Sequence, residues 1–279
     1  MAFEESIAEH TARREKALAM GSKRKLAEFA AAGILNARQR IDYLLDADSF
    51  REIGLFTVSE RREDRDRSPC DGLVAGYGHI DGRPVALAAY DFTTLGASSS
   101  PNASQKFQHT RKAAAENGLP MIVLAEAGGA RIPDVMGAQG IARTRSHQRY
   151  DRRRQTPWVT AILGPSYGSP TWKAAMSDYV LMRKGAVMAV SSARVTSVAI
   201  SEDVDPEELG GWRMRTEVTG EVDRACDTDQ DVLDNVKRFL SYLPSHNMEP
   251  PPLAAVPAGS GDGMREILNI IPEERSRVY

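Results

Sequence analysis

Two copies of one arrangement, a short apolar strand followed by a glycine-containing turn and a helix, occupy residues 119–178 and constrain the fold more than any other feature. The apolar runs are Pro120–Ala125 and Trp158–Leu163, and unbroken runs of this length between turn residues indicate buried strands. The turns are Glu126–Pro133 in the first copy and Gly164–Pro170 in the second. Because the first N–H groups of a helix have no partner within the helix, two such turns side by side could hold one developing oxyanion.

The composition excludes several classes of protein. A chain of 279 residues can form one large domain or two small ones. Its net charge of −2 gives no overall bias toward nucleic acid or a membrane surface, so a polyanionic cofactor would need a local basic patch. The two cysteines, Cys70 and Cys226, indicate neither a disulfide framework nor a cysteine-based zinc site. We find no secretory signal and no membrane-spanning apolar run, so we expect a cytoplasmic protein.

Turn and capping residues divide the rest of the chain into alternating helices and strands. Residues 1–46 are expected to be helical, with a third helix over Ala37–Leu45. The Asp81–Gly82 dipeptide predicts a hairpin between two strands, and Ser100 followed by Pro101 predicts the start of a long helix. Further expected elements are a helix over 133–150, a helix that continues from the second turn through 182, a strand over 186–190, a short capped helix over 205–211, an amphipathic helix over 229–243 and an extended arm after 250.

Charged and titratable residues give weaker signals. The charged tracts 61–67 and 149–154 are typical of surface loops, with phosphate contact as the alternative for the first. No two histidines have i, i+4 spacing, so a metal site has no support. Capping explains Asp71, Asp91 and Asp178, which fall at element ends. Glu126 precedes the first glycine pair and either faces the cleft or stands at a helix N-terminus.

The second turn contains a possible hydrolase motif. Gly164–Gly168 matches G-x-S-x-G, between a predicted strand and a helix, as a nucleophile elbow requires. A triad would also need a histidine and an acid later in the chain, and only His246 follows, beside a proline-rich arm. A serine hydrolase built on Ser166 is therefore kept as a minor alternative.

Motifs spread along most of the chain resemble those of one family. Gly96–Ala97–Ser98 is similar to a G-G-S turn, and Gly128–Ile132 matches S-G-G-A-R-I, with Ala127 in place of the serine. Glu207–Gly211 matches E-E-L-G-G. Residues 37–52 are similar to the family's opening helix, and residues 241–252 to its S-Y-L-P-S-N-N-x-E-P-P-P segment. On these residues the chain resembles the carboxyltransferase (β) subunits of biotin-dependent acyl-CoA carboxylases, of the propionyl-CoA carboxylase type.

The resemblance implies an α/β fold of the crotonase-like class, a ββα superhelix. We expect a helical N-terminal arm over residues 1–46, a single carboxyltransferase domain over 47–250 and an extended C-terminal arm over 251–279. In this fold two backbone N–H groups bind the oxygen of an acyl thioester.

Carried over by position, the first of these N–H groups comes from Gly128 or Gly129 and the second from Ser169, which follows Gly168. These four residues are the expected catalytic positions. Residues expected to contact the substrate are Gly96, Ala97, Ala130, Arg131 and Tyr167. For Arg131, pairing with a carboxylate at the helix start is the alternative.

The resemblance also implies cofactors and partners. In the family, carboxyl passes from N1-carboxybiotin to the α-carbon of an acyl-CoA, and the biotin is attached to a separate carrier that a separate biotin carboxylase loads. A homologous C-terminal domain of another subunit holds the biotin ureido oxygen. We therefore expect acyl-CoA as substrate, carrier-bound biotin as cofactor, no metal in this chain, and an oligomeric assembly with no nucleic-acid or membrane partner.

Three departures from the family pattern bear on function, one of which is the segment Ser191–Val195 in place of the family's T-G-P-x-V. The turn Gly164–Pro170 stands where the family has G-P-C-A-G-G-A, so that the second glycine is Ser169 and the next residue, proline, lacks an N–H. Tyr167 and Trp172 are expected to crowd the pocket further. The sequence stops at Tyr279, before the family's second crotonase-like domain.

We therefore weigh three hypotheses. The first is the acyl-CoA-binding half of a split carboxyltransferase that works with a separately encoded C-terminal-like chain. The second is acyl-CoA decarboxylation, or biotin-independent thioester chemistry, on the same scaffold. The third is a non-catalytic binding or assembly subunit.

Overall fold

An eight-stranded sheet is the framework of the chain in the computed structural model, which describes residues 3–136, 156–246 and 248–277. The strand order is β1-β2-β3-β4-β5-β6-β8, and β7 pairs with β5 beside this path. The first three strands pair antiparallel, and every ladder from β3 onward is parallel. The strands are β1 (Arg51–Ile53), β2 (Leu73–Ile80), β3 (Arg83–Tyr90), β4 (Met121–Ala127), β5 (Trp158–Tyr167), β6 (Tyr179–Arg183), β7 (Val187–Ala189) and β8 (Arg224–Cys226).

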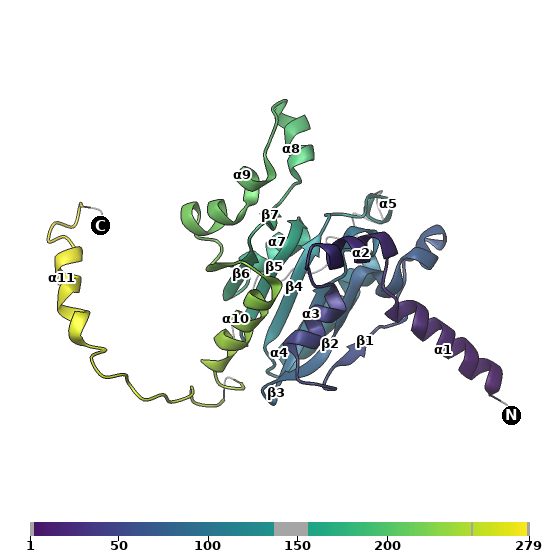
Figure 1. The fold of residues 1–279 in the computed structure, drawn as a ribbon, viewed down its shortest axis with the longest axis horizontal. Helices are drawn as coiled ribbons and strands as arrows, with labels where there is room; N and C mark the ends of the chain where they lie inside the picture. Colours follow the sequence, from purple (N-terminus) through teal and green to yellow (C-terminus); the bar gives the residue numbers. More distant parts are fainter. Residues whose placement is uncertain (1–2, 137–155, 247, 278–279) are drawn as a thin grey trace.

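Helices pack on both faces of this sheet, as Figure 1 shows. Two of them, α3 and α10, cover one face, and α4 and α7 contribute to the core on the other. The described helices are α1 (Glu4–Leu18), α2 (Lys23–Ala31), α3 (Ala37–Leu44), α4 (Pro101–Glu116), α5 (Ile132–Val135), α7 (Ser169–Ala175), α8 (Ala193–Ile200), α9 (Pro206–Gly210), α10 (Asp229–Ser241) and α11 (Ile267–Ile270).

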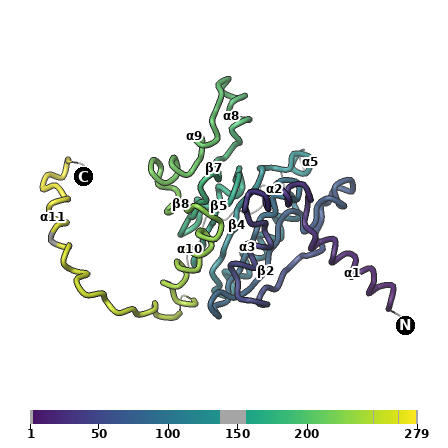
Figure 2. Tube along the Cα trace, in the orientation of Figure 1, coloured from purple at the N-terminus to yellow at the C-terminus, as the bar shows by residue number. Residues whose placement is uncertain are grey.

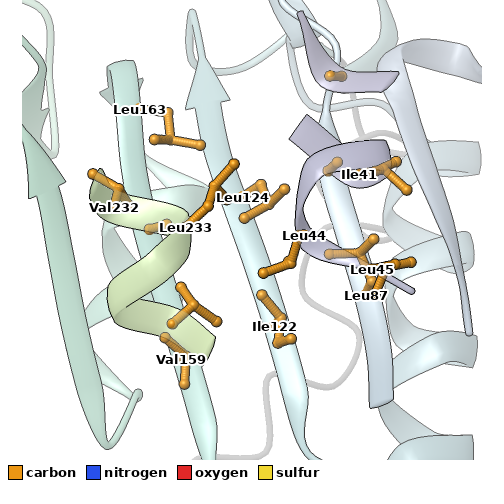
Figure 3. Close-up of a cluster of buried hydrophobic side chains, with 14 of the residues drawn as sticks. Ile41, Leu44, Leu45, Leu87, Ile122, Leu124, Val159, Leu163, Val232 and Leu233 are labelled. Carbon is orange, nitrogen blue, oxygen red and sulfur yellow. The ribbon is translucent and has the colours of Figure 1, made fainter. Parts of the chain in front are cut away.

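Alternate residues of the central strands face two separate cores. In β4, Ile122 and Leu124 belong to the core beneath α3 and α10, whereas Val123 belongs to the core beneath α4. Figure 3 shows Ile41 and Leu44 of α3 in the first of these cores, beside the central strands. Because both faces of the sheet are covered, its central parallel strands are mostly apolar, which accounts for the unbroken apolar runs of the sequence.

Several local signals in the sequence are confirmed. The Asp81–Gly82 turn joins β2 to β3 in a hairpin. The Ser100 side chain accepts a hydrogen bond from the Ala103 N–H at the start of α4, with Pro101 as the first helical residue. The helices at 37–44, 206–210 and 229–241 and the strand at 187–189 also lie where we expect them.

The expected helix that continues through residue 182 is wrong. Helix α7 ends at Ala175, and residues 179–183 form β6, which pairs in parallel with β5. A short apolar run that is buried on both faces has no periodicity to distinguish strand from helix. Most of the helix expected over 133–150, and the charged tract 149–154, lie outside the described residues.

Strand β5 is longer than we expected and includes most of the residues that we assigned to the second turn. Gly164, assigned to the turn, lies inside the strand, where an added Cβ would come within 2.4 Å of the Glu126 Oε1 atom. Glycine is the residue that permits this close approach between neighbouring strands. The turn is therefore confined to residues immediately before α7.

The ends of the chain extend away from the sheet in opposite directions. Helix α1 projects on one side and the segment that ends in α11 on the other (Figures 1 and 2). Helix α3 instead packs on the sheet, although it belongs to the expected arm over 1–46. The boundaries at residues 46 and 250 stay predictions. Within the described part of the chain, no helix has both the length and the apolar character that crossing a membrane requires.

Candidate functional site

The turns after β4 and β5 leave the sheet side by side. The two strands are parallel neighbours, and Ala127 at the end of β4 pairs with Ser166 near the end of β5. A Cβ added to Gly129 would lie 3.8 Å from the Tyr167 Cβ, so the two turns are in van der Waals proximity. The expected convergence of the glycine turns is therefore a feature of the described structure.

The expected amide donors differ in whether they are free. The Gly128 N–H donates to the Gly96 carbonyl oxygen at 2.8 Å, and the Gly168 N–H donates to the Ala189 carbonyl oxygen at 3.0 Å. Neither can serve as an oxyanion donor while these bonds hold. The Gly129 N–H forms no hydrogen bond to another described residue, nor does that of Ser169, the first residue of α7. Of the four expected catalytic positions, only Gly129 and Ser169 thus have an N–H without a partner among the described residues, and a catalytic role for any of the four stays a prediction.

The Gly129 turn is held in place by its own backbone. Its φ of 101° lies in the region that favours glycine. The Ser99 N–H donates to the Gly129 carbonyl oxygen at 2.8 Å, and the Arg131 N–H donates to the Ser99 carbonyl oxygen at 3.0 Å. These bonds leave the Gly129 carbonyl engaged and its N–H available.

Gly96 contacts this turn through its backbone, and its neighbour Ala97 is buried. The Gly96 carbonyl oxygen accepts the bond from Gly128. Both Gly96 and Ala97 were expected to contact substrate, and that contact stays a prediction. Ala130, by contrast, is exposed, and Tyr167 is partly buried. That burial raises the pKa of the Tyr167 hydroxyl. A substrate contact for either residue stays a prediction.

The Arg131 side chain does not point to an open site. It is 5% exposed and forms an ion pair of 2.5 Å between its Nη1 and Asp71 Oδ1. Its Nη2 donates to the Ser98 carbonyl oxygen at 3.2 Å. Asp71 also accepts a hydrogen bond from the Ser100 hydroxyl. The alternative of pairing with a carboxylate is therefore the observed one, and Arg131 joins the segment 98–100 to the buried Asp71.

The hydrolase alternative at Ser166 is wrong. Ser166 lies in β5 with no exposed surface, and its hydroxyl donates to the Gly164 carbonyl oxygen at 3.3 Å. A nucleophile elbow needs a serine at a sharp turn with its oxygen exposed. The strand continues past the motif, so the G-x-S-x-G match has no catalytic geometry.

Glu126 also lies away from the turns' open side. It is 3% exposed and pairs with Arg40 of α3, with 2.5 Å between Oε2 and Nη1. Its carboxylate therefore joins α3 to β4 and is not available as a base in the cleft. The cleft-facing alternative is not observed.

One residue beside the turns was missed. Lys173 is 9% exposed, and its Nζ lies 3.0 Å from the Ser169 Oγ. The i, i+4 spacing of a serine and a lysine at a predicted helix start was a signal that could have found it.

As for metals, no group of three or more potential ligand side chains gathers anywhere in the described ranges.

Comparisons with known proteins identify a family and several relatives of this chain. The model of the carboxyl transferase domain family matches residues 29–279. The carboxyltransferase subunit of propionyl-CoA carboxylase from Haloferax mediterranei is 31% identical over 283 aligned residues, which cover 100% of this chain and 55% of that protein. A structure of transcarboxylase 12S with methylmalonyl-coenzyme A bound has a TM-score of 0.81 and 28% identity, and the match covers 99% of this chain and 55% of that one.

A shorter protein also matches. A chain of a Pseudomonas malonate decarboxylase hetero-tetramer has a TM-score of 0.64 and 25% identity, and the match covers 86% of this chain and 92% of that one. The chain thus spans about half the length of the curated relatives it matches. The expected α/β fold of the crotonase-like class is confirmed. With a family model matched over most of its length, the chain belongs to the carboxyl transferase domain family.

Proposed function

We propose that this chain is the acyl-CoA-binding half of a biotin-dependent carboxyltransferase. The observation that carries the proposal is that the backbone N–H groups of Gly129 and Ser169 have no partner among the described residues and lie on turns that leave adjacent parallel strands. Two N–H groups on neighbouring turns would suit a thioester oxygen whose negative charge grows when the α-carbon loses its proton. Carboxybiotin, held on a separate carrier, would supply the carboxyl group.

The surrounding side chains support catalysis by backbone donors. Two buried carboxylates, Glu126 and Asp71, are both paired with arginines, so neither is free to accept the α-proton. This chain would therefore bind and orient the acyl thioester and stabilise the enolate. For carboxyl transfer we assign the role of base to the biotin ring.

A second carboxyltransferase chain is the partner that this proposal requires. It would be separately encoded and would complete the site opposite the two amides, together with a biotin carboxylase and a biotin carrier. Helix α8 carries Val195, Val198 and Ile200 with exposed fractions of 59%, 79% and 52%. Figure 1 shows α8 projecting from the body of the protein. Exposed apolar side chains gathered on one element are typical of surfaces that bind another protein.

The test uses the reconstituted assembly. The chain is co-expressed with the candidate partner, carrier and biotin carboxylase, and incorporation of labelled bicarbonate into propionyl-CoA is measured. Gly129→Ala should reduce the rate by about 10²–10³, the usual loss when one oxyanion donor is displaced, because a residue with a Cβ is strained at a φ of 101°.

Gly33→Ala is the matched control. Gly33 also has a positive φ, 67°, but lies between α2 and α3 with nothing within 4 Å of an added Cβ. This variant bears the same kind of strain away from the turns and should keep its rate. Equal losses in the two variants would contradict the role of the Gly129 amide.

Decarboxylation is the second candidate. It is favoured by the match to the malonate decarboxylase chain, which is covered over 92% of its length and therefore is similar in size to this one. The same amides would hold the enolate that forms when carbon dioxide leaves. Release of labelled carbon dioxide from malonyl-CoA without carrier-bound biotin would favour it over carboxylation. Absence of acyl-CoA binding in calorimetry would favour a non-catalytic subunit over both.

A further inference from the structure

Ser169 and Lys173 form a pair of a kind that nucleophilic enzymes use. They occupy the first and fifth positions of α7, so that their side chains lie on one face of the helix. The Lys173 Nζ lies 3.0 Å from the Ser169 Oγ, within hydrogen-bonding distance. Ser169 is partly exposed beside the Gly129 turn, whereas Lys173 is buried beneath it.

The surroundings of Lys173 contain hydroxyl groups and aromatic rings. Its Nζ hydrogen-bonds the Tyr90 hydroxyl and lies 3.8 Å from the centre of the Phe107 ring. None of the carboxylates in the described ranges forms an ion pair with it. Within the described ranges, the polar contacts of this amine are therefore two hydroxyls, one of which belongs to a partly exposed serine.

We propose that Ser169 is a nucleophile with Lys173 as its general base, and that the chain transfers acyl groups from thioesters to water. Lysine serves as the base for a catalytic serine on several unrelated folds. In the first step, Lys173 accepts the hydroxyl proton while the Ser169 oxygen bonds to the thioester carbonyl carbon. The carbon–sulfur bond then breaks, and the proton passes from Lys173 to the departing thiolate.

Water completes the reaction. Lys173 accepts a proton from water as the water oxygen attacks the carbonyl carbon of the acyl-serine ester. Lys173 then returns this proton to the Ser169 oxygen when the ester bond to Ser169 breaks. The net change is thioester plus water to carboxylic acid plus thiol, with no oxidation. This inference rests on the proposed oxyanion donors, because the Gly129 N–H would also stabilise the tetrahedral intermediate.

Residue 169 combines two functions that serine proteases also combine in one residue. There the nucleophilic serine donates its own backbone N–H to the oxyanion hole. Ser169 has a free N–H and a hydroxyl within reach of a base, whereas Ser166 has neither access nor a base. The family turn has glycine at this position, so the nucleophile would be particular to this chain and not to the scaffold.

The test traps the acyl-enzyme on the full chain. Protein is incubated with a fluorophosphonate and, separately, with acetyl-CoA and propionyl-CoA, and the modified peptide is identified by mass spectrometry. We expect modification at Ser169 and release of free thiol. Ser169→Ala should abolish both, and Ser166→Ala, the matched control, should leave both unchanged.

Two substitutions of Lys173 separate a base from a packing residue. Lys173→Met keeps an unbranched chain without the amine. Lys173→Arg keeps a positive charge and hydrogen-bond donors but cannot accept a proton. If Lys173 is the base, both variants should lose labelling rate by about 10²-fold or more, the range for general-base catalysis. Thermal unfolding of each variant verifies that it is folded.

Two results would overturn the inference. One is a folded wild-type chain with no adduct at Ser169, and the other is labelling that is unaffected in Lys173→Arg. Failure of this inference can be distinguished from failure of carboxyl transfer, because labelling of Ser169 needs neither biotin nor a partner chain. Bicarbonate incorporation without labelling would reject only the nucleophile, and labelling without incorporation would reject only carboxyl transfer.

Discussion

A buried arginine links three elements beneath the candidate site. Arg40 of α3 forms ion pairs with Glu126 at 2.5 Å and with Asp229, the first residue of α10, at 3.0 Å. Its side chain is 1% exposed, and those of the two acids are 4% and 1% exposed. Asp229 has further partners in Arg183 at 3.0 Å and the Leu35 N–H, whereas Arg40 is the only cation among the described residues that pairs with Glu126.

Arg40→Met is therefore expected to be strongly destabilising. The substitution would leave Glu126 buried without a cation, and breaking a buried ion pair by removing one partner typically costs about 3–5 kcal/mol. Replacing both partners with apolar residues is often near neutral, because no charge is then left without a partner. The double variant Arg40→Met/Glu126→Met should thus recover most of the loss.

The free energy of unfolding is measured from urea denaturation followed by circular dichroism at pH 7. Arg24→Met is the control, because Arg24 and Glu28 form an i, i+4 pair on α2 with exposed fractions of 78% and 54%. Exposed pairs contribute little, so this variant should change the unfolding free energy far less. A change of less than about 1 kcal/mol in Arg40→Met would refute the reasoning.

Three other outcomes are expected. Arg131→Lys should lower the free energy of unfolding by roughly 1–3 kcal/mol in urea denaturation. The reason is that one ammonium cannot keep both the ion pair with Asp71 and the bond to the Ser98 carbonyl oxygen. An unchanged free energy of unfolding would contradict this. Burial raises the pKa of the Cys70 thiol from 9.0 to about 12, so Ellman's reagent at pH 8 should react with it only after unfolding. The contribution of Cys70 to stability should fall as pH rises from about 9 toward about 12, since only the unfolded thiol ionises there. If the difference in unfolding free energy between wild type and Cys70→Ala stays the same over this pH range, the expectation is wrong. Val198→Asp should prevent co-purification of a partner chain without lowering the urea midpoint of the isolated protein, because this side chain is 79% exposed.

Local chemistry made much of the fold predictable. The Asp81–Gly82 turn, the Ser100 cap and the Asp205 cap of α9 depend on residues next to one another in the chain, and all three are confirmed. The family motifs predicted the fold class because they span most of the sequence. Signals of this type do not depend on how distant segments meet.

The failures come from tertiary context. Residues 179–182 were expected to continue the preceding helix, but pairing with β5 makes them a strand. Gly164 was assigned to a turn, yet its position is explained by the side chain of Glu126 on the neighbouring strand. Neither contact can be inferred from the residues that flank it in sequence.

The candidate site was predictable in its location and not in the hydrogen bonds of its backbone amides. Two glycine turns on adjacent strands follow from the strand–turn–helix repeats. Which amides are free depends on carbonyl groups elsewhere in the chain, those of Gly96 and Ala189, which occupy the N–H groups of Gly128 and Gly168. Such pairings depend on the positions of separate loops, so no local pattern identifies them.

Because a backbone N–H does not depend on the identity of the side chain, the second turn can depart from the family motif and keep an available amide. A backbone N–H needs only the correct path of the chain, and a serine at the first position of a helix follows that path as well as a glycine does. Pro170 lies at the second helical position, where its missing N–H would have had no partner within the helix. The substitution therefore leaves the amide in place and adds a hydroxyl within reach of Lys173. A scaffold that binds its substrate by backbone groups can in this way acquire a side-chain nucleophile without losing the oxyanion donor that the new reaction also needs.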